Sequence, residues 1–226
     1  MGTRHLICVF YNGRFVLAQY GQLDGYPEIQ GLVVVQFLRD TDNITRLKQG
    51  LAHMYTPTAK EEEEMIRAIN RANDEWFKAA SKGEVSLLER QNSVYPSMST
   101  HTSAGILEVV AKATAEAKVP IKLETEFIHD GLFCEWAYVI DLDEEVLEVY
   151  TGLEREWKGS SERFKDVDEA VEGFVPSLVK RFAFAELPEG KAELVDAINE
   201  AIKLRDSRLT GEKREGGGDK VDASAV

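Results

Sequence analysis

The segment RHLICVFYNGRFVLAQY, residues 4–20, constrains the possible folds more than any other part of the chain. Two runs rich in β-branched and aromatic residues flank Asn12 and Gly13. This pair is typical of a type I′ turn, in which both central residues need positive φ, so the segment predicts a β-hairpin. Both faces of its strands are apolar along most of their length, whereas a hairpin exposed on one side would alternate. We therefore expect this hairpin to be central, with layers packed on both faces of its sheet.

A two-residue loop also fixes which residues of the two strands face each other. Counting outward from the turn pairs Val9 with Val16 and Leu6 with Gln19. This register predicts that Gln19 and Leu6 share one face of the sheet.

The rest of the chain combines a second β region with several helical patterns. After Pro120 the sequence predicts strands, including a second hairpin that turns at residues 143–145. We predict an α+β fold whose central antiparallel sheet is built from two hairpins and covered by helices, with layers on both faces. Capping residues and apolar residues at helical spacing predict helices at about residues 27–38, 41–50, 58–81, 99–117 and 189–205.

Length and composition favour one globular domain. The chain has 226 residues, 43% of them hydrophobic, which is enough to bury a sizeable core. From residue 207 the sequence SRLTGEKREGGGDKVDASAV offers few apolar residues to bury. We predict a single α+β domain over residues 1–206 and a disordered tail over residues 207–226.

Charge, cysteine content and hydropathy restrict the partners and the compartment. The formal net charge is −13, and such a surface repels phosphate backbones, so we expect no nucleic-acid partner. Cys8 and Cys134 lie in apolar runs and are expected to be buried thiols in a reducing compartment. No apolar run approaches the roughly 20 residues of a membrane span, and the N-terminus lacks a signal-peptide pattern. The sequence thus predicts a cytoplasmic protein with no membrane association.

The stretch AQYGQLDGYPEIQG, residues 18–31, is the first candidate site. It leaves the sheet at the end where the first strand begins, so polar side chains of two strands and a loop should converge there. Its Gly and Pro residues allow a tight backbone, which suits either a polar turn before a helix or a binding site. Arg4 and Asp24 could form an ion pair that orients the loop. The expected ligand-binding residues are Arg4, His5, Gln19, Gln22, Asp24 and Tyr26.

A second candidate site is the start of the helix expected from Ser99 or Thr100. The sequence STHTSAG places more hydroxyl groups here than capping requires. Free backbone N–H groups at a helix start can bind an anion or a carbonyl group. We predict that His101 and Ser103 bind a ligand, and ordinary helix capping is the alternative.

The sequence contains none of the common catalytic motifs. A P-loop, G-x-G-x-x-G, C-x-x-C, H-E-x-x-H and G-x-S-x-G are all absent. The four histidines show no metal-ligand spacing. We predict no metal and no cofactor, and the sequence leaves open the catalytic residues, whether the protein is an enzyme and its oligomeric state.

The N-terminal sequence MGTRHLICVFYNGRFVLAQYGQLDGYPEIQG resembles the opening of a broad family of uncharacterised fungal, bacterial and phage proteins. Their usual form is GTR, a hydrophobic strand, a DG turn and QYGQWDGYP followed by Gly-Gln-Gly. The segment LFCEWAYVIDLDEEVLEVYTG is similar to a later part of the fungal members. This chain has Leu23 where the family has Trp and Ile29 where it has Gly, and both departures could weaken a site. The resemblance implies no activity, because none is assigned to the family.

Three functional hypotheses follow from these observations. The first is a domain that binds a small molecule or a peptide at the QYGQLDGYP corner. The second is a non-enzymatic protein-interaction or regulatory module. The third is a remote relative of N-terminal-nucleophile hydrolases that lacks an obvious nucleophile, an analogy of fold alone. A concave pocket at the corner favours the first hypothesis, and a flat apolar patch favours the second.

Overall fold

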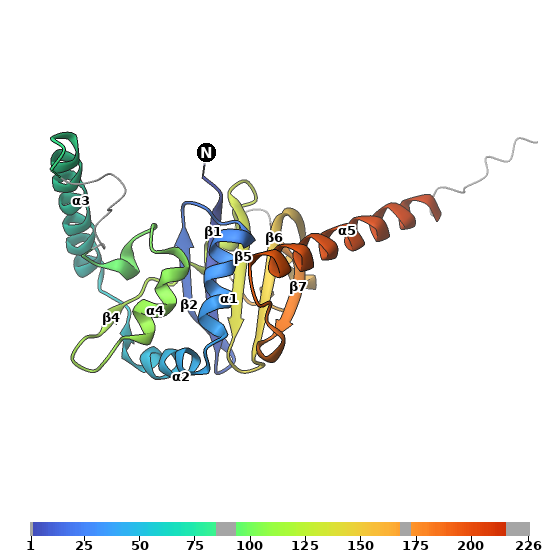
Figure 1. Ribbon diagram of the computed structural model, residues 1–226, viewed down its shortest axis with the longest axis horizontal. Helices are drawn as coiled ribbons and strands as arrows, with labels where there is room; N and C mark the ends of the chain where they lie inside the picture. Colours follow the sequence, from blue (N-terminus) through green and yellow to red (C-terminus); the bar gives the residue numbers. More distant parts are fainter. Residues whose placement is uncertain (1, 85–93, 168–172, 216–226) are drawn as a thin grey trace, which may run out of the picture.

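A five-stranded sheet lies at the centre of the structure (Figure 1), a computed structural model that describes residues 2–84, 94–167 and 173–215. Its strand order is β2-β1-β5-β6-β7, and β1 and β5 run parallel while the other neighbours run antiparallel. A separate two-stranded sheet pairs β3 with β4. The strands are β1 (Arg4–Tyr11), β2 (Arg14–Gly21), β3 (Met54–Tyr55), β4 (Val119–Pro120), β5 (Cys134–Asp141), β6 (Val146–Trp157) and β7 (Phe174–Ala183).

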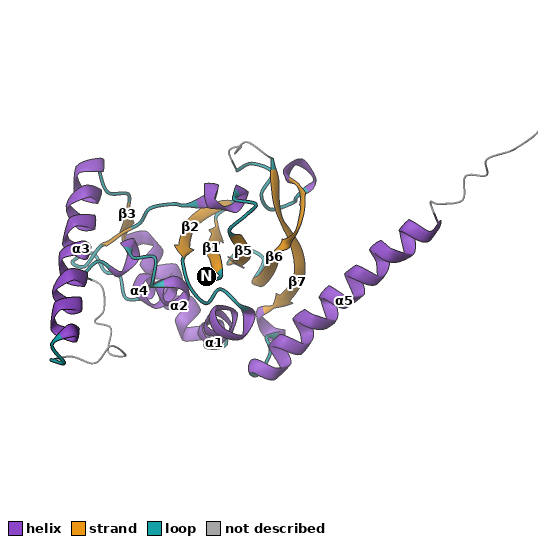
Figure 2. Ribbon diagram, turned by 90° about the horizontal axis from the view of Figure 1, so that it is seen from above, coloured by secondary structure: helices purple, strands orange, loops and turns teal. Residues whose placement is uncertain are grey.

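Helices cover one face of the main sheet, and loops with short helical turns cover the other (Figure 2). In both views α3 stands beyond the β2 edge, and α5 projects from the opposite end of the molecule (Figures 1 and 2). The α-helices are α1 (Leu32–Leu38), α2 (Thr41–Gly50), α3 (Ala59–Ser81), α4 (Ile106–Ala111) and α5 (Lys191–Glu215). A π-helix at Pro27–Gly31 leads into α1, and 3-10 turns occupy Leu51–His53, Pro96–Met98, Ser103–Gly105, Thr125–His129, Lys158–Ser160 and Phe184–Glu186.

This architecture confirms the predicted α+β class, and the first hairpin forms with the predicted turn. Asn12 and Gly13 both have positive φ, 53° and 74°, as a type I′ turn requires. The expectation that the whole hairpin is central was wrong: β1 is flanked on both sides, but β2 is an edge strand. Both of its faces can nevertheless be apolar, because burial depends on the layers above and below a strand and not on its neighbours in the sheet.

The predicted hairpin register was also wrong beyond the first pairs. Phe10 pairs with Phe15 as expected, but Val9 pairs with Leu17, so Val16 is the extra residue of a β-bulge. A bulge inserts one residue into one strand and reverses the face on which every later side chain lies. Gln19 consequently pairs with Ile7 rather than Leu6, which moves it to the helix-covered face.

Two apolar clusters hold the sheet between its layers. On the helix-covered face, buried residues of β1, β2 and β5 pack with α1, α4 and the first turns of α5, for example Ile7 with Val34 and Ile106 in one cluster. On the second face, Leu6 and Cys8 pack in a cluster with Ile128 and Phe164. The predicted packing of layers on both faces of the first strand is therefore confirmed.

Two helices differ in extent from the sequence-based expectation. Helix α4 begins at Ile106 instead of Ser99 or Thr100 and ends at Ala111. Helix α5 continues to Glu215, past residue 207, where the tail was expected to begin, and residues 216–226 lie outside the described part of the chain. None of the helices in the described ranges has the length and apolar character needed to cross a bilayer.

Candidate functional site

The QYGQLDGYP corner is built around His5, which the sheet register places opposite Gly21. The His5 side chain is fully buried, and neither ring nitrogen has a hydrogen-bond partner of good geometry among the described residues. A methyl group added to Gly21 would come within 2.2 Å of the His5 ring and 2.8 Å of the Ser103 hydroxyl oxygen. Glycine at position 21 therefore allows the ring and Ser103 to close over the strand end.

Burial controls the protonation of His5. Desolvation lowers the pKa of His5 to about 4, because the charged ring cannot be solvated there, and the Thr3 backbone only partly opposes this shift. The ring is neutral at neutral pH, when it offers one N–H donor and one acceptor.

The second candidate segment lies directly against this corner, so the structure brings the two predicted sites together. The backbone N–H of Gln22 donates to the Thr100 carbonyl at 3.1 Å. The Gln19 side-chain amide donates to the Ser99 carbonyl at 3.2 Å, and its burial is nearly complete. The bulge in β2 is what turns Gln19 toward this segment. Sequence reasoning treated the two segments as separate sites and did not predict their contact.

The segment from Ser99 to Gly105 is not the open helix start that the sequence suggested. The Thr102 and Gly105 N–H groups donate to the Ser99 and Thr102 carbonyls, and the Ala104 N–H donates to the side chain of Gln30 at 3.1 Å. Ser103 is buried and has φ of 48°, a conformation that costs energy for residues other than glycine. These N–H groups are used within the protein, so the geometry gives no support to an anion site at this position.

Three of the predicted ligand-binding residues point away from the corner or into solvent. The guanidinium of Arg4 lies 4.0 Å from the centre of the Phe133 ring, a cation–π contact. Asp24 is exposed and has φ of 58°, and Tyr26 is also exposed. The expected Arg4–Asp24 ion pair is not formed in the described structure.

A cavity of about 380 Å³ opens where the corner, residues 97–101 and α3 meet. Of the predicted ligand-binding residues, Gln19 and His101 line it, whereas Arg4, His5, Gln22, Asp24, Tyr26 and Ser103 do not. Amide and hydroxyl groups predominate among its polar groups: Gln19, Asn70, Asn73, Ser99 and Thr100. The sequence did not point to Asn70 and Asn73, because polar residues on an amphipathic helix are normally read as its solvated face.

Charged groups close one side of this cavity. Lys122 donates to Glu62 at 2.8 Å, and this hydrogen bond raises the pKa of Lys122. Glu124 accepts a hydrogen bond from the Tyr20 backbone N–H at 3.0 Å, yet burial raises its pKa. The cavity wall thus carries one compensated ion pair and one carboxylate that is easier to protonate than usual.

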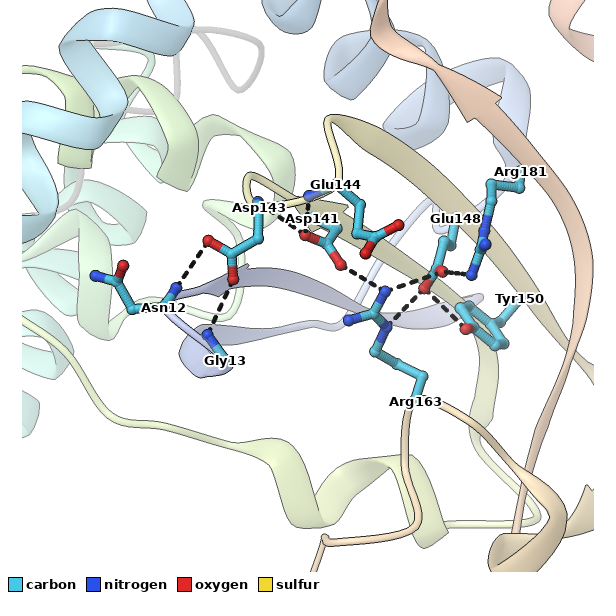
Figure 3. A network of polar contacts seen from close by, with 9 residues as sticks. All are labelled: Asn12, Gly13, Asp141, Asp143, Glu144, Glu148, Tyr150, Arg163 and Arg181. Atoms are coloured by element: carbon cyan, nitrogen blue, oxygen red, sulfur yellow. Dashed lines mark hydrogen bonds and ion pairs between the residues drawn. The ribbon is translucent and has the colours of Figure 1, made fainter.

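A second polar cluster lies at the other end of the sheet (Figure 3). Arg163 donates to Asp141 at 2.6 Å and to Glu148 at 2.8 and 3.0 Å, and Glu148 also accepts from Arg181 and Tyr150. Burial alone would raise the pKa of Glu148, but the hydrogen bonds and charge of Arg163 and the other donors hold it below its usual value. We call these five residues the Arg163 network. The carboxylates of this network are already paired with arginine side chains. Because Arg163 lies in the loop of residues 158–167, its hydrogen bonds fasten that loop to the sheet.

The two cysteine thiols are not activated as nucleophiles, because their pKa values are raised. Cys8 and Cys134 are buried free thiols, and burial raises the pKa of both, that of Cys134 to about 12. Within the described ranges, no three His, Cys, Asp or Glu side chains are grouped so that they could hold a metal ion.

In comparisons with known proteins, no family model, curated protein or solved structure matches this chain. The resemblance of the N-terminal sequence to the uncharacterised family therefore stays a prediction, and the functional argument depends on the geometry alone.

Proposed function

We propose that this protein binds a small polar molecule in the cavity between α3 and residues 97–101. The observation that carries the proposal is that the cavity is lined by residues of both predicted segments, Gln19 from the corner and Ser99–His101 from the second. A volume of about 380 Å³ falls in the usual range for small-molecule sites.

The lining defines the chemistry of the ligand. Side-chain amides offer both donors and acceptors, and hydroxyl groups can act as either. The ion pair of Lys122 with Glu62 is already compensated, so it adds little attraction for a charged ligand. We therefore favour an uncharged molecule with several hydroxyl or amide groups, such as a polyol, a sugar or a short amide. The proposal concerns binding, and it assigns no reaction.

The two alternative hypotheses have less support at this corner. Leu23, Tyr26 and Ile29 leave apolar surface exposed at the corner, as an interaction module would need. The cavity beside Gln19 is concave, however, and most of the residues that line it are polar. A hydrolase of the N-terminal-nucleophile type would need an accessible nucleophile near the start of the chain, and Thr3 and Cys8 are both buried. The cytoplasmic location and the absence of a nucleic-acid partner remain predictions from composition.

The test is a ligand screen on the full chain by thermal shift, followed by calorimetry, with polyols, sugars, nucleosides and short amides as probes. We expect at least one of these classes to stabilise the protein. Asn73→Ala should then weaken binding by about three- to tenfold, since a neutral hydrogen bond is worth about 0.5–1.5 kcal/mol. Asn199→Ala is the matched control, because it makes the same change on an exposed face of α5.

Two results would contradict the proposal. One is that none of the probe classes binds. The other is that Asn73→Ala and Asn199→Ala bind the best probe equally well, which would place the ligand elsewhere.

A further inference from the structure

The outer edge of β2 is covered at one end only. Near the corner, the Ala18 carbonyl accepts from the Glu124 N–H at 3.0 Å, and the Tyr20 N–H donates to the Glu124 carboxylate. Toward the hairpin turn, residues 14–16 form no comparable bond with the neighbouring segment in the described structure. The bulge at Val16 lies at this change, and bulges often end pairing at a sheet edge.

A cavity of about 480 Å³ occupies the space beside the open part of this edge. The hairpin forms one wall, and α2 with its following turn, β3 and residues 121 and 123 form the others. None of the residues that line it also lines the cavity of the proposed function, so the two sites are separate.

The charge of this cavity is opposite to that of the protein. Arg14 and Lys48 line it and no Asp or Glu does, although the chain has a net charge of −13. The Arg14 side chain forms no ion pair or hydrogen bond with any described residue. Among the described residues, Lys48 forms an ion pair only with the more exposed Glu145, at 3.9 Å, a separation at which a surface pair contributes little. Both cations can therefore attract an anionic group.

Part of the remaining lining is apolar and only partly covered. Leu123 is 47% exposed, and Met54 and Tyr55 are half-buried. An aromatic or aliphatic group in the cavity would remove these surfaces from water, which is favourable in proportion to the apolar area buried.

We propose that this cavity is a second site, which binds a small carboxylic acid with an aromatic or aliphatic body. The carboxylate lies between Arg14 and Lys48, and the apolar body packs against Met54, Tyr55 and Leu123. A guanidinium pairs well with a carboxylate because its N–H groups match both oxygens. The site requires both parts of the ligand, since neither small inorganic anions nor neutral apolar compounds use the whole lining.

The test is calorimetry or ligand-observed NMR on the full chain with 3-phenylpropanoate, octanoate and the neutral 3-phenylpropanamide as probes. We expect a carboxylate to bind at least tenfold more tightly than the amide. Arg14→Gln and Lys48→Gln should each weaken carboxylate binding by about tenfold or more, in line with charge-assisted hydrogen bonds. Lys60→Gln on α3 is the matched control, because its side chain is 85% exposed and lines neither cavity.

A steric variant tests the position of the apolar body without changing the charge. Ala52 is exposed and lines the cavity, so Ala52→Phe should keep the fold and reduce binding by filling the space. The proposal is overturned if neither carboxylate binds, if the amide binds as tightly as the acid, or if Lys60→Gln reduces binding as much as Arg14→Gln.

Discussion

At the scale of single residues, His5 shows how a polar side chain can be tied to the fold rather than to a ligand. The bulge and the glycines at positions 21 and 25 let the chain close around its ring. The enclosure leaves both ring nitrogens without a good partner, and a buried polar group without a hydrogen bond costs free energy. His5 should therefore affect the stability of the protein more directly than it affects binding in the adjacent cavity.

The pH dependence of stability follows from the pKa of His5. In the unfolded chain the ring titrates near 6.5, but in the folded protein its pKa is about 4. Between these values the unfolded state binds the extra proton, so stability falls as pH decreases. The loss should reach about 2 kcal/mol between pH 7 and pH 5. Urea unfolding over this range measures it.

The control for this effect separates His5 from the other titrating groups. His5→Gln should flatten the pH dependence between pH 7 and pH 5, whatever its own cost in stability. His53→Gln, which makes the same change at a half-buried position in the turn after α2, is the matched control. An unchanged slope in His5→Gln would show that the ring is solvated in the folded state.

At the scale of elements, the Arg163 network connects a long loop to β5, β6 and β7. Residues 158–167 cover the second face of the sheet with Phe164, and the hydrogen bonds of Arg163 hold that loop in place (Figure 3). Removing one partner of a buried ion pair leaves an uncompensated charge, which is more costly than never having the pair.

Arg163→Met should therefore destabilise the protein by about 3–5 kcal/mol. Arg67→Met is the control: it breaks an exposed pair with Glu63 on α3 and should cost less than 1 kcal/mol. Equilibrium urea unfolding at pH 7 compares the two. Equal losses would show that the network is as weakly coupled as a surface pair.

The Arg163 network, like His5, loses stability as the pH falls, but it does so over a more acidic range than His5. The folded-state pKa of Glu148 is held below its usual value, so its contribution is present above about pH 4.5 and is lost at more acidic pH. Below about pH 5 Glu148 adds to the loss, whereas the raised pKa of Glu124 opposes the loss from His5, so comparison with His5→Gln isolates the His5 contribution.

The elements show which parts of the fold the sequence could predict. The turn at Asn12 and Gly13, the apolar strands and the capped helices α2 and α3 depend on local chemistry, so their patterns sufficed. The bulge at Val16 is not encoded by a local motif, and missing it placed Gln19 on the wrong face of the sheet. The many hydroxyl groups before α4 gave several possible helix starts, and the side chain of Gln30 is one of the partners that stabilise the turn before it.

At the scale of the whole molecule, the two proposed sites lie along the same edge of the sheet. The cavity beside Gln19 depends on contacts between residues 19–22 and 99–100, and the cavity beside Arg14 depends on the gap between β2 and residues 121–123. Spacing in the sequence predicts neither of these cavities, because each lies between segments that are about 80 to 100 residues apart in the chain. The sequence could indicate Gln19 and His101, but only the folded chain shows that they share a cavity.

Helix α5, at the other end of the molecule, allows a test of whether residues 207–226 contribute to the stability of the domain. Its buried anchors are Leu194 and Ile198, and Arg205 forms an ion pair with Glu154 at 2.9 Å. Deletion of residues 207–226 keeps all three of these contacts. It should leave the melting temperature within about 2 °C, because a loss of 1 kcal/mol would shift a protein of this size by about that much or more. Ile198→Ala is the comparison, and we expect it to lower the free energy of unfolding by about 2–5 kcal/mol. A large drop in melting temperature for the deletion would mean that residues after 206 also pack against the domain.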